Sequence, residues 1–473
     1  MSTGSTTGSS GIRSSIDSFF HITERGSNIR TEIWGGVITF LSMLYILVVN
    51  PLILAGPTGM DFQQLATATA LASFVSCMLM GLYAKFPVAL APGMGINAFV
   101  AFTIVQFMGF DYYQALMVVL VTGILFFIMS VTGIRTKILN GIPPVIKASI
   151  GAGIGFFIVV VGLYNAGIIV HGDGSALMLG QLGSPGVLLG LVCINVTIAL
   201  WYLNRWYAIL AGALLTLVIG LIGGQLFGWD TTVDGTSLIP GVGTAAITSF
   251  ISLPDMGLFG AVFTEFTMFD LTLLPAFIVA TISLLVVDMF DTTGTLFAVG
   301  ESAGIMNKDG VIEGNEKALQ VDAVATMFGA VAGTSTTTSF IESATGLAAG
   351  ARTGLMAVTV GVLFFLAMFF SPTFAVVTSA CTVGALVMVG FMMIRHIKGV
   401  DMQDPICVAT AFTTMFMMGL SGSITDGIAF GTFIYLLGMT LTGRRNEVSM
   451  TMAILGLVFL GYLVVTYGVI PNM

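Results

Sequence analysis

The stretch GTSTTTS at residues 333–339 interrupts an otherwise apolar segment, and Glu342 follows it. A second interruption, APGMGIN at residues 91–97, breaks another apolar segment. Glycine, proline and short hydroxyl residues disfavour a continuous helix. Glycine is too flexible, proline lacks the backbone N–H that a helix needs, and the hydroxyls compete for the backbone hydrogen bonds. The two stretches therefore predict two broken helices whose freed backbone groups can bind a ligand.

The composition around these breaks is that of a membrane protein. Apolar residues make up 56% of the 473 residues and charged residues only 8%, against about 25% charged in a typical soluble domain. A membrane-spanning helix needs about 20 mostly apolar residues, and this pattern continues from Ile33 almost to the end of the chain. The sequence predicts an all-α, polytopic membrane protein.

Apolar segments of spanning length indicate about fourteen transmembrane helices. They lie at residues 33–54, 65–84, 88–107, 113–133, 147–167, 186–203, 206–228, 271–299, 317–333, 338–352, 354–370, 376–394, 404–420 and 424–441. The third and the tenth contain the two interruptions. A further apolar run at 449–468 is either a fifteenth crossing or a helix lying at the membrane surface, and its uncharged end does not decide between them.

The positive charges test this count, because cytoplasmic loops carry an excess of lysine and arginine. With the N-terminus in the cytoplasm and alternating crossings, all 15 basic residues fall on the cytoplasmic side. The outer loops carry only acids, such as Asp61, Asp111, Asp173, Asp230, Asp234 and Asp255. We therefore expect a multi-pass protein of the cytoplasmic (inner) membrane with a cytoplasmic N-terminus.

Weak internal symmetry divides the chain into two halves. Residues 143–162 and 371–390 each start at or beside a proline and follow the fourth span of their half. Seven spans per half force the two halves into opposite orientations, and inverted repeats with matched broken helices are typical of secondary transporters. The expected organisation is a loose cytoplasmic tail (1–30), a first repeat (31–228), an extracytoplasmic connecting segment (229–270), a second repeat (271–445) and a C-terminal hydrophobic segment (446–473).

Five acidic residues fall inside the apolar segments: Asp288, Asp291, Asp322, Glu342 and Asp426. A charge at the bilayer centre costs at least about 2.5–3.5 kcal/mol. No lysine or arginine lies within the spans away from a helix end, so the sequence suggests that no buried base pairs with these acids. They are then protonated or line a watery path. We predict proton coupling through Glu342, Asp291, Asp288 and Asp322, and a structural role for Asp426 at an outer helix start.

The polar groups near the two breaks suggest what the site binds. Asp291, Glu342, Asn97, Thr338 and Ser339 supply carboxylates, an amide and hydroxyls without a fixed cation. This set fits a neutral, flat molecule with N–H donors, or a cation, because a carboxylate can accept two parallel N–H bonds. Phe99 offers an aromatic face on which a ring can stack. All six residues are candidate substrate contacts.

Other classes of function find little support in the sequence. His21, His171 and His396 are far apart and the four cysteines form no CxxC pair, so no metal site is expected. No HExxH, nucleophile elbow or P-loop occurs, which argues against an enzyme and against a bound cofactor. A nucleic-acid partner would need a basic patch, which is absent from the sequence.

The motifs of this chain resemble those of a known family. The stretches TFLSMLYILVVNPLIL (39–54), PVALAPGMGINAFVAF (87–102), VDMFDTTGTLFAV (287–299), DAVATMFGAVAGTSTTTSFIESATGLAAGARTGL (322–355) and SITDGIAFG (423–431) are similar to those of the AzgA-like purine permeases. These permeases belong to the nucleobase-cation symporter-2 group, also called the nucleobase-ascorbate transporter group. The resemblance covers residues 20–470.

The resemblance implies the fold of the uracil permease, with two inverted seven-helix repeats sorted into a core domain and a gate domain. It implies that broken helices three and ten begin with short extended stretches that pair across the core. The substrate then lies between core and gate, held by Asp291 and Glu342. Asn97 and Phe99 match the family's third helix, and Asp322 matches its ninth-helix acid.

The function implied by the resemblance is proton-coupled uptake of adenine, guanine or hypoxanthine across a lipid bilayer, by a chain that can form a homodimer. Transport of another nucleobase, such as uracil, xanthine or urate, is the alternative within the same group. An anion transporter of the same fold is disfavoured by the uncompensated acids. A channel is a further alternative, which differs in that it cannot concentrate a neutral solute.

Overall fold

The computed structural model describes residues 7–172, 175–203, 205, 207–233, 235–245, 249–264, 273–303 and 315–469. Within these residues, nine helices are long and apolar enough to cross a membrane. Shorter apolar helices occupy Met94–Phe107, Leu274–Met289, Pro405–Ser421 and Met450–Leu463. Two further helices lie in the second half, at Asn315–Ala332 and Ser343–Ala348. The long helices, the shorter apolar helices and these two together account for the expected fourteen segments and for the additional run at the C-terminal end.

The first half consists of seven helical segments, the third of which is broken. In chain order its elements are α2 (Ile29–Met43), α3 (Ile46–Thr58), α4 (Phe62–Leu79), β1 (Leu90–Pro92), α5 (Met94–Ala98) continued by η2 (Phe99–Phe107), α6 (Tyr112–Thr132), α7 (Ile134–Gly141), α8 (Pro144–Asn165), α9 (Pro185–Tyr202) and α10 (Ala208–Phe227). Helices α2 and α3 form a single bent span, and the short helix α7 connects α6 to α8.

The second half repeats this order and then adds one helix. Its elements are α11 (Leu274–Ala303), α12 (Asn315–Ala332), β6 (Thr337–Ser339), α13 (Ser343–Ala348), α14 (Gly354–Ala367), α16 (Ser379–Met393), α17 (Pro405–Ser421), α18 (Ile424–Leu441) and α19 (Met450–Leu463), continued by η10 (Val464–Val469). Thus β6 and α13 stand where β1 and α5 stand in the first half. Seven helical segments with a broken third one recur in each half.

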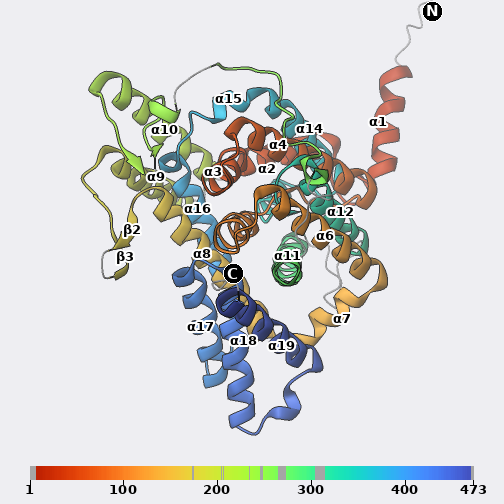
Figure 1. Cartoon of the computed structure of the whole chain (residues 1–473). Helices are drawn as coiled ribbons and strands as arrows, with labels where there is room; N and C mark the ends of the chain where they lie inside the picture. Colours follow the sequence, from red (N-terminus) through yellow and green to blue (C-terminus); the bar gives the residue numbers. More distant parts are fainter. Residues whose placement is uncertain are drawn as a thin grey trace, which may run out of the picture.

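The helices sort into two bodies that mix both halves of the chain. One body, here called the core, joins α2, α3, α4 and α6 with α11, α12, α13 and α14, and the other, the gate, joins α8, α9 and α10 with α16, α17 and α18. In Figure 1 most of the core lies at the upper right and the gate at the left and lower left, and the core helix α11 is seen end-on near the middle. Each body is therefore built from corresponding helices of the two halves.

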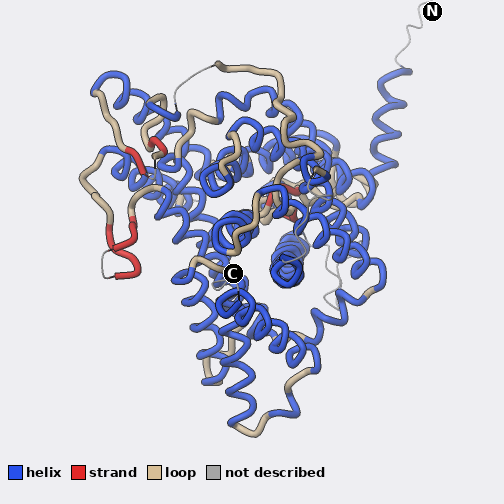
Figure 2. Tube along the Cα trace, in the orientation of Figure 1, coloured by secondary structure: helices blue, strands red, loops and turns tan. Residues whose placement is uncertain are grey.

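The two short strands β1 and β6 pair with each other in the middle of the molecule (Figure 2). They run antiparallel, with Leu90 opposite Ser339 and Pro92 opposite Thr337. This pairing confirms the expectation that the two interrupted helices begin with extended stretches that meet. It also explains why a polar, non-helical segment is stable inside the protein, because the backbone groups of each strand form hydrogen bonds with those of the other.

Neighbouring residues complete the hydrogen bonds of this strand pair. The amide of Gly93 donates to the carbonyl of Thr336 at 3.1 Å, and the amide of Phe340 donates to the carbonyl of Ala89 at 2.9 Å. The amide of Ala89 also donates to the hydroxyl of Ser343 at 3.0 Å. Hydrogen bonds between protein groups thus hold the backbone at the centre of the core, which fixes the positions of the residues that follow each strand.

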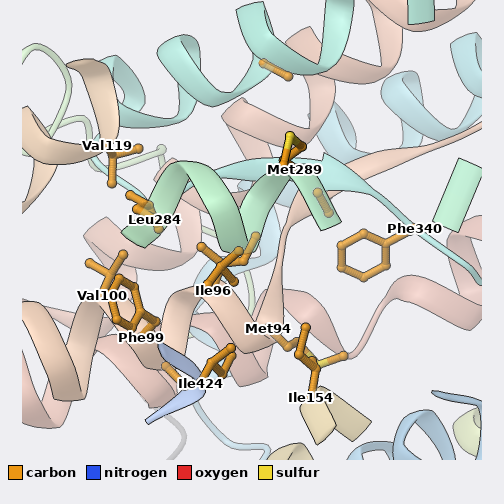
Figure 3. Packing of buried hydrophobic residues seen from close by; sticks show 14 of the residues in the cluster. Met94, Ile96, Phe99, Val100, Val119, Ile154, Leu284, Met289, Phe340 and Ile424 are labelled. Carbon is orange, nitrogen blue, oxygen red and sulfur yellow. The ribbon is translucent and has the colours of Figure 1, made fainter. Parts of the chain in front are cut away.

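Buried apolar side chains surround this centre and hold the broken helices in place (Figure 3). Phe99 is fully buried, and Met94 and Ile154 are 7% and 2% exposed. A Cβ atom added at Gly95 would lie 2.9 Å from Ile154 on α8 and 3.3 Å from Ile424 on α18. Glycine at this position therefore allows the half-helix α5 to approach the gate closely.

Several features differ from the sequence-based expectations. Part of the N-terminal tail is helical rather than loose, because α1 covers Thr7–Phe20 (Figure 1). Two small hairpins, β2 (Ile169–Gly172) with β3 (Ser175–Leu179) and β4 (Thr232–Val233) with β5 (Thr236–Ser237), were not expected. Asp173 and Asp234, expected in outer loops, and Lys308 lie outside the described residues. The proposed boundaries of the repeats and of the connecting segment stay a prediction.

Candidate functional site

A cavity of about 640 Å³ lies between the core and the gate. The core contributes the start of α5, the middle of α11 and the segment from β6 to Glu342, whereas the gate contributes the first half of α8 and the end of α16. Both broken helices therefore face the same cavity. The cavity is larger than the smallest ligand sites, which begin at about 300 Å³, and its lining is mostly apolar, with polar groups at its two ends.

Four of the residues expected at the site come together at one of these ends. Asp291 of α11, Thr338 and Ser339 of β6, and Glu342 after β6 all line the cavity. A Cβ atom added at Gly93 would lie 2.6 Å from Cγ2 of Thr338 and 3.5 Å from a carboxylate oxygen of Asp291. Glycine at position 93 thus leaves room for the two broken helices to converge on Asp291.

Tyr45 orients the carboxylate of Glu342. Its hydroxyl donates a hydrogen bond of 2.5 Å to Oε1 of Glu342. The other oxygen, Oε2, is buried and accepts no hydrogen bond from any residue that the structure describes. A buried carboxylate oxygen without a donor is unfavourable in a folded protein, so it indicates a group poised to accept a hydrogen bond from a ligand.

The sequence analysis did not single out Tyr45. It lies between α2 and α3, where the first span bends. An aromatic residue in an apolar segment carries no signal of its own, because most such residues pack in the core or face lipid. The bend itself becomes visible only in the structure, between α2 and α3.

Asp322 and Asp288 lie behind the cavity, in the core. The hydroxyl of Thr292 donates to Asp322 at 2.7 Å and lies 2.9 Å from the hydroxyl of Thr338. The hydroxyl of Ser339 donates to the other oxygen of Asp322 at 3.4 Å. Asp322 therefore holds strand β6 against α11. Asp288 accepts a hydrogen bond of 3.2 Å from Thr326, and neither acid lines the cavity described above.

Asn97 and Phe99 lie close to the site but do not line the cavity. Asn97 is fully buried, and its side-chain oxygen accepts a hydrogen bond from Ser335 in the stretch that leads into β6. Phe99 is fully buried in the apolar core, as Figure 3 shows. Both residues stay predictions as substrate contacts; in this structure they fix how the first broken helix meets the second.

Arg135, at the start of α7 beyond the end of α6, is 1% exposed and lies 4.0 Å from the ring centroid of Phe126. Burial lowers the pKa of its guanidinium to about 10, and the nearby carboxylates of Asp322 and Asp288 act in the opposite direction. The expectation that no buried base accompanies the acids is therefore wrong. A long side chain outside the counted spans reaches back into the core, which a count of charges by segment does not reveal.

The other end of the cavity is basic. Lys147 on α8, together with Arg395 and His396 just after α16, lines this end. All three lie near helix ends, and the distribution of basic residues predicts that these ends face the cytoplasm. The cavity thus extends from the carboxylates near the middle of the molecule toward one end of the helices.

These features define a class of protein. Two inverted seven-helix repeats, paired broken helices, and a polar cavity between two helical bodies are the features of a membrane transporter with a site near the bilayer midplane. The transmembrane domain of a cyanobacterium bicarbonate transporter, BicA, has the same fold. Its TM-score is 0.61 at 14% identity, with 84% of this chain and 97% of that chain covered.

The sequence comparisons identify the family. Residues 30–405 match the Permease family model, Xan_ur_permease. The chain is 42% identical to the guanine/hypoxanthine permease PbuG of Bacillus subtilis, with 95% of this chain and 99% of that protein covered. It is 36% identical to the adenine permease AdeQ of Escherichia coli, with 94% and 95% covered. The chain belongs to this permease family.

Proposed function

We propose that this protein is a secondary active transporter that takes up purine nucleobases together with protons across the cytoplasmic membrane. The observation that carries the proposal is the buried carboxylate of Glu342, a residue that lines the cavity between two helical bodies: Tyr45 fixes one of its oxygens, and the other is buried without a donor among the described residues. The choice of substrate is supported by the relatives that this chain matches over almost their whole length, which are named as guanine/hypoxanthine and adenine permeases.

The chemistry of the polar end suits a neutral base. The free oxygen of Glu342 and the carboxylate of Asp291 accept N–H donors, and the hydroxyls of Thr338 and Ser339 accept or donate hydrogen bonds. An anion would meet two acids at this end of the cavity, which disfavours it. A purine carries several N–H groups and ring nitrogens in one plane, so it can satisfy these groups together.

The apolar side chains that line the cavity add to the fit. Met94, Ile154 and Phe340 line it next to the polar groups. They exclude water from the two faces of a bound ring, and this burial adds about 25 cal/mol per Å² of apolar surface. Another nucleobase, such as uracil, xanthine or urate, can use the same polar groups, so the cavity walls and their spacing distinguish the substrates.

The free-energy cost of charging two buried carboxylates supports proton coupling. Two carboxylates that face one cavity in a poorly polar surrounding resist being charged together. We propose that a proton from the outside neutralises one of the two carboxylates, that the base then binds, and that the core and gate move to open the cavity to the cytoplasm. Release of the proton at the higher cytoplasmic pH restores the charge and weakens binding. Asp291 and Glu342 titrate as a pair in this scheme.

The orientation of the cavity fits this cycle. With the N-terminus in the cytoplasm, the end lined by Lys147, Arg395 and His396 faces the cell interior. The structure then corresponds to the state that releases substrate inward. A homodimer stays a prediction, as do the proton-coupling roles of Asp288 and Asp322.

The test is transport by cells that lack their own purine permeases. Uptake of labelled adenine, guanine, hypoxanthine and uracil is measured with and without a protonophore. We expect uptake of at least one purine, and we expect the protonophore to prevent its accumulation. Absence of purine uptake by protein that reaches the membrane would overturn the proposed substrate, and accumulation that the protonophore leaves intact would overturn proton coupling.

A further inference from the structure

A second cavity, of about 290 Å³, lies between the core and the gate at the end opposite to the basic residues. It is lined by η2, by the last part of α8, by the start of α18 and by the C-terminal segment. The first cavity meets α8 between Pro144 and Ile158, whereas the second meets it between Phe157 and Asn165. The two cavities therefore approach the middle of the molecule from opposite sides.

The C-terminal segment 450–469 is long enough to cross the membrane. It comprises α19 and η10, and 20 residues at about 1.5 Å each span about 30 Å. At its start, the hydroxyl of Ser449 donates to the carbonyl of Gly141, at the end of the molecule where Arg444 and Arg445 lie. At its far end, Tyr467 contacts Asp426 at the beginning of α18. The segment thus runs the full length of α18 in the opposite direction.

The exposed face of this segment is apolar. Met452, Phe459 and Tyr462 are buried against the protein, whereas Ile454, Leu457 and Leu460 are 53%, 70% and 51% exposed. A helix of spanning length with an apolar outer face needs lipid to cover it. A helix lying at the membrane surface would carry charged residues on that face, and residues 450–469 contain none.

Asp426 ties the end of the segment to the gate. The hydroxyl of Tyr462 donates to Oδ1 of Asp426 at 2.9 Å, and the hydroxyl of Tyr467 donates to Oδ2 at 2.5 Å. Both oxygens of one buried carboxylate are therefore used to attach the C-terminal segment to α18. When the gate moves relative to the core, these bonds make the segment move with α18.

Tyr467 also contacts the core. Its ring centroid lies 5.1 Å from that of Phe107 at the end of η2, with the ring planes at 51°. Phe107 and Tyr467 both line the second cavity and are both about half exposed. The pair thus joins a residue of the core to a residue attached to the gate, at the mouth of the second cavity.

We propose that residues 450–469 form a fifteenth membrane crossing, and that the Phe107–Tyr467 contact is the outer gate of the transport path. The contact is closed in this structure, in which the first cavity leads from Glu342 to the end lined by Lys147, Arg395 and His396. It separates when the outer cavity opens to admit substrate. A transporter must keep one side closed while the other is open, so the second part of this inference rests on the proposed function.

The crossing is tested by labelling cysteines in intact cells. Gly468 and Asn446 are exposed at the two ends of the segment, and a Cβ atom at Gly468 has its nearest neighbour at 3.9 Å. Gly468→Cys and Asn446→Cys are made separately in a Cys407→Ser background and treated with a membrane-impermeant maleimide. We expect Gly468→Cys to be labelled and Asn446→Cys to be labelled only after permeabilisation. Labelling of both, or of neither, from outside would overturn the crossing.

The gate is tested by cross-linking. In Phe107→Cys/Tyr467→Cys protein, a disulfide should hold the outer contact closed, so oxidation should lower purine uptake at least tenfold and a reductant should restore it. The matched control is Leu436→Cys/Gly456→Cys, which links α18 to α19 within one moving unit, at positions where a Cβ atom added at Gly456 would lie 2.5 Å from Cδ1 of Leu436. Its uptake should not change on oxidation. Equal uptake by the oxidised and reduced Phe107→Cys/Tyr467→Cys protein would overturn the gate.

The two proposals fail in different ways. If the unaltered protein takes up no purine, the proposed function fails while the maleimide labelling still decides the topology. If the unaltered protein takes up purine and the cross-link has no effect, only the gate fails. Purine binding to the oxidised protein in detergent should persist, since the first cavity is unaffected by the cross-link.

Discussion

The hydroxyl of Tyr45 donates a hydrogen bond of 2.5 Å to Oε1 of Glu342, while Oε2 of Glu342 receives none from the residues that the structure describes. The two residues come from the bend in the first span and from the second broken helix, 297 positions apart. Tyr45 thus fixes the orientation of the carboxylate, and we propose that its other oxygen binds the substrate.

Replacement of Glu342 by glutamine should weaken purine binding strongly. Hydrogen bonds to charged groups contribute about 1.5–3 kcal/mol, which corresponds to about 10- to 150-fold in affinity. We expect this loss in purine binding by purified Glu342→Gln protein, and little uptake by cells. Glu316→Gln, which alters an exposed acid at the start of α12, is the control and should behave as the unaltered protein. Uptake by Glu342→Gln that still reaches a normal accumulation would contradict the role of Glu342.

Replacement of Tyr45 by phenylalanine should have a smaller effect that depends on Glu342. The carboxylate keeps its charge but loses its fixed orientation, so we expect purine affinity to fall by up to about tenfold. In the double variant Tyr45→Phe/Glu342→Gln, the affinity should equal that of Glu342→Gln alone, because the hydroxyl acts through the carboxylate. Additive losses would show that Tyr45 acts independently. Tyr435→Phe, in the gate helix α18, is the control for loss of a buried tyrosine hydroxyl.

Gly93 should not tolerate a side chain. A Cβ atom there would lie 2.6 Å from Thr338, and overpacking of this kind costs about 1–3 kcal/mol. We expect Gly93→Ala to reduce purine uptake at least tenfold because Thr338 of β6 must shift. Gly56→Ala, at a position with no atom within 4 Å of the added Cβ, should transport normally. Normal uptake by Gly93→Ala would show that the close approach of the two broken helices is not required.

Variants of Asp322 and its partner distinguish a structural role of this carboxylate from a role as proton carrier. It accepts hydrogen bonds from Thr292 and Ser339, so Asp322→Asn should lower purine affinity by weakening the position of β6. If Asp322 only positions β6, the remaining uptake should stay sensitive to a protonophore, and Thr292→Val should reproduce the loss of affinity. If Asp322 carries the coupled proton, Asp322→Asn should equilibrate purine without concentrating it, whereas Thr292→Val should still concentrate it.

The sequence predicted much of the fold for clear physical reasons. Long apolar segments, the positions of the basic residues and the two interruptions at 91–97 and 333–339 indicate the helices and the broken pair. That Asp291, Glu342, Thr338 and Ser339 lie together could be expected, because acids and hydroxyls within a membrane segment are costly in free energy and therefore stand out; their roles as substrate contacts stay predictions. The pairing of β1 with β6 was expected from the family resemblance, since two distant strands leave no local pattern.

Other features depend on contacts that no local pattern encodes. Tyr45 is an aromatic residue in an apolar segment, and its role is visible only when Glu342 lies beside it. Arg135 was placed in a cytoplasmic loop, but its long side chain is buried near Asp288 and Asp322. The segment 449–468 could not be assigned because its end carries no charge, and the contacts of Ser449 and Tyr467 give its direction instead.

The central claim, that purine and proton move together through the site at Glu342, is tested most directly in proteoliposomes. The purified protein is reconstituted with a pH-sensitive dye inside, and guanine or hypoxanthine is added outside without any imposed gradient. We predict that entry of the purine acidifies the interior, and that Glu342→Gln protein shows no such signal. Entry of labelled purine with no change in internal pH would contradict proton coupling, and an equal pH signal with Glu342→Gln would contradict the role of Glu342.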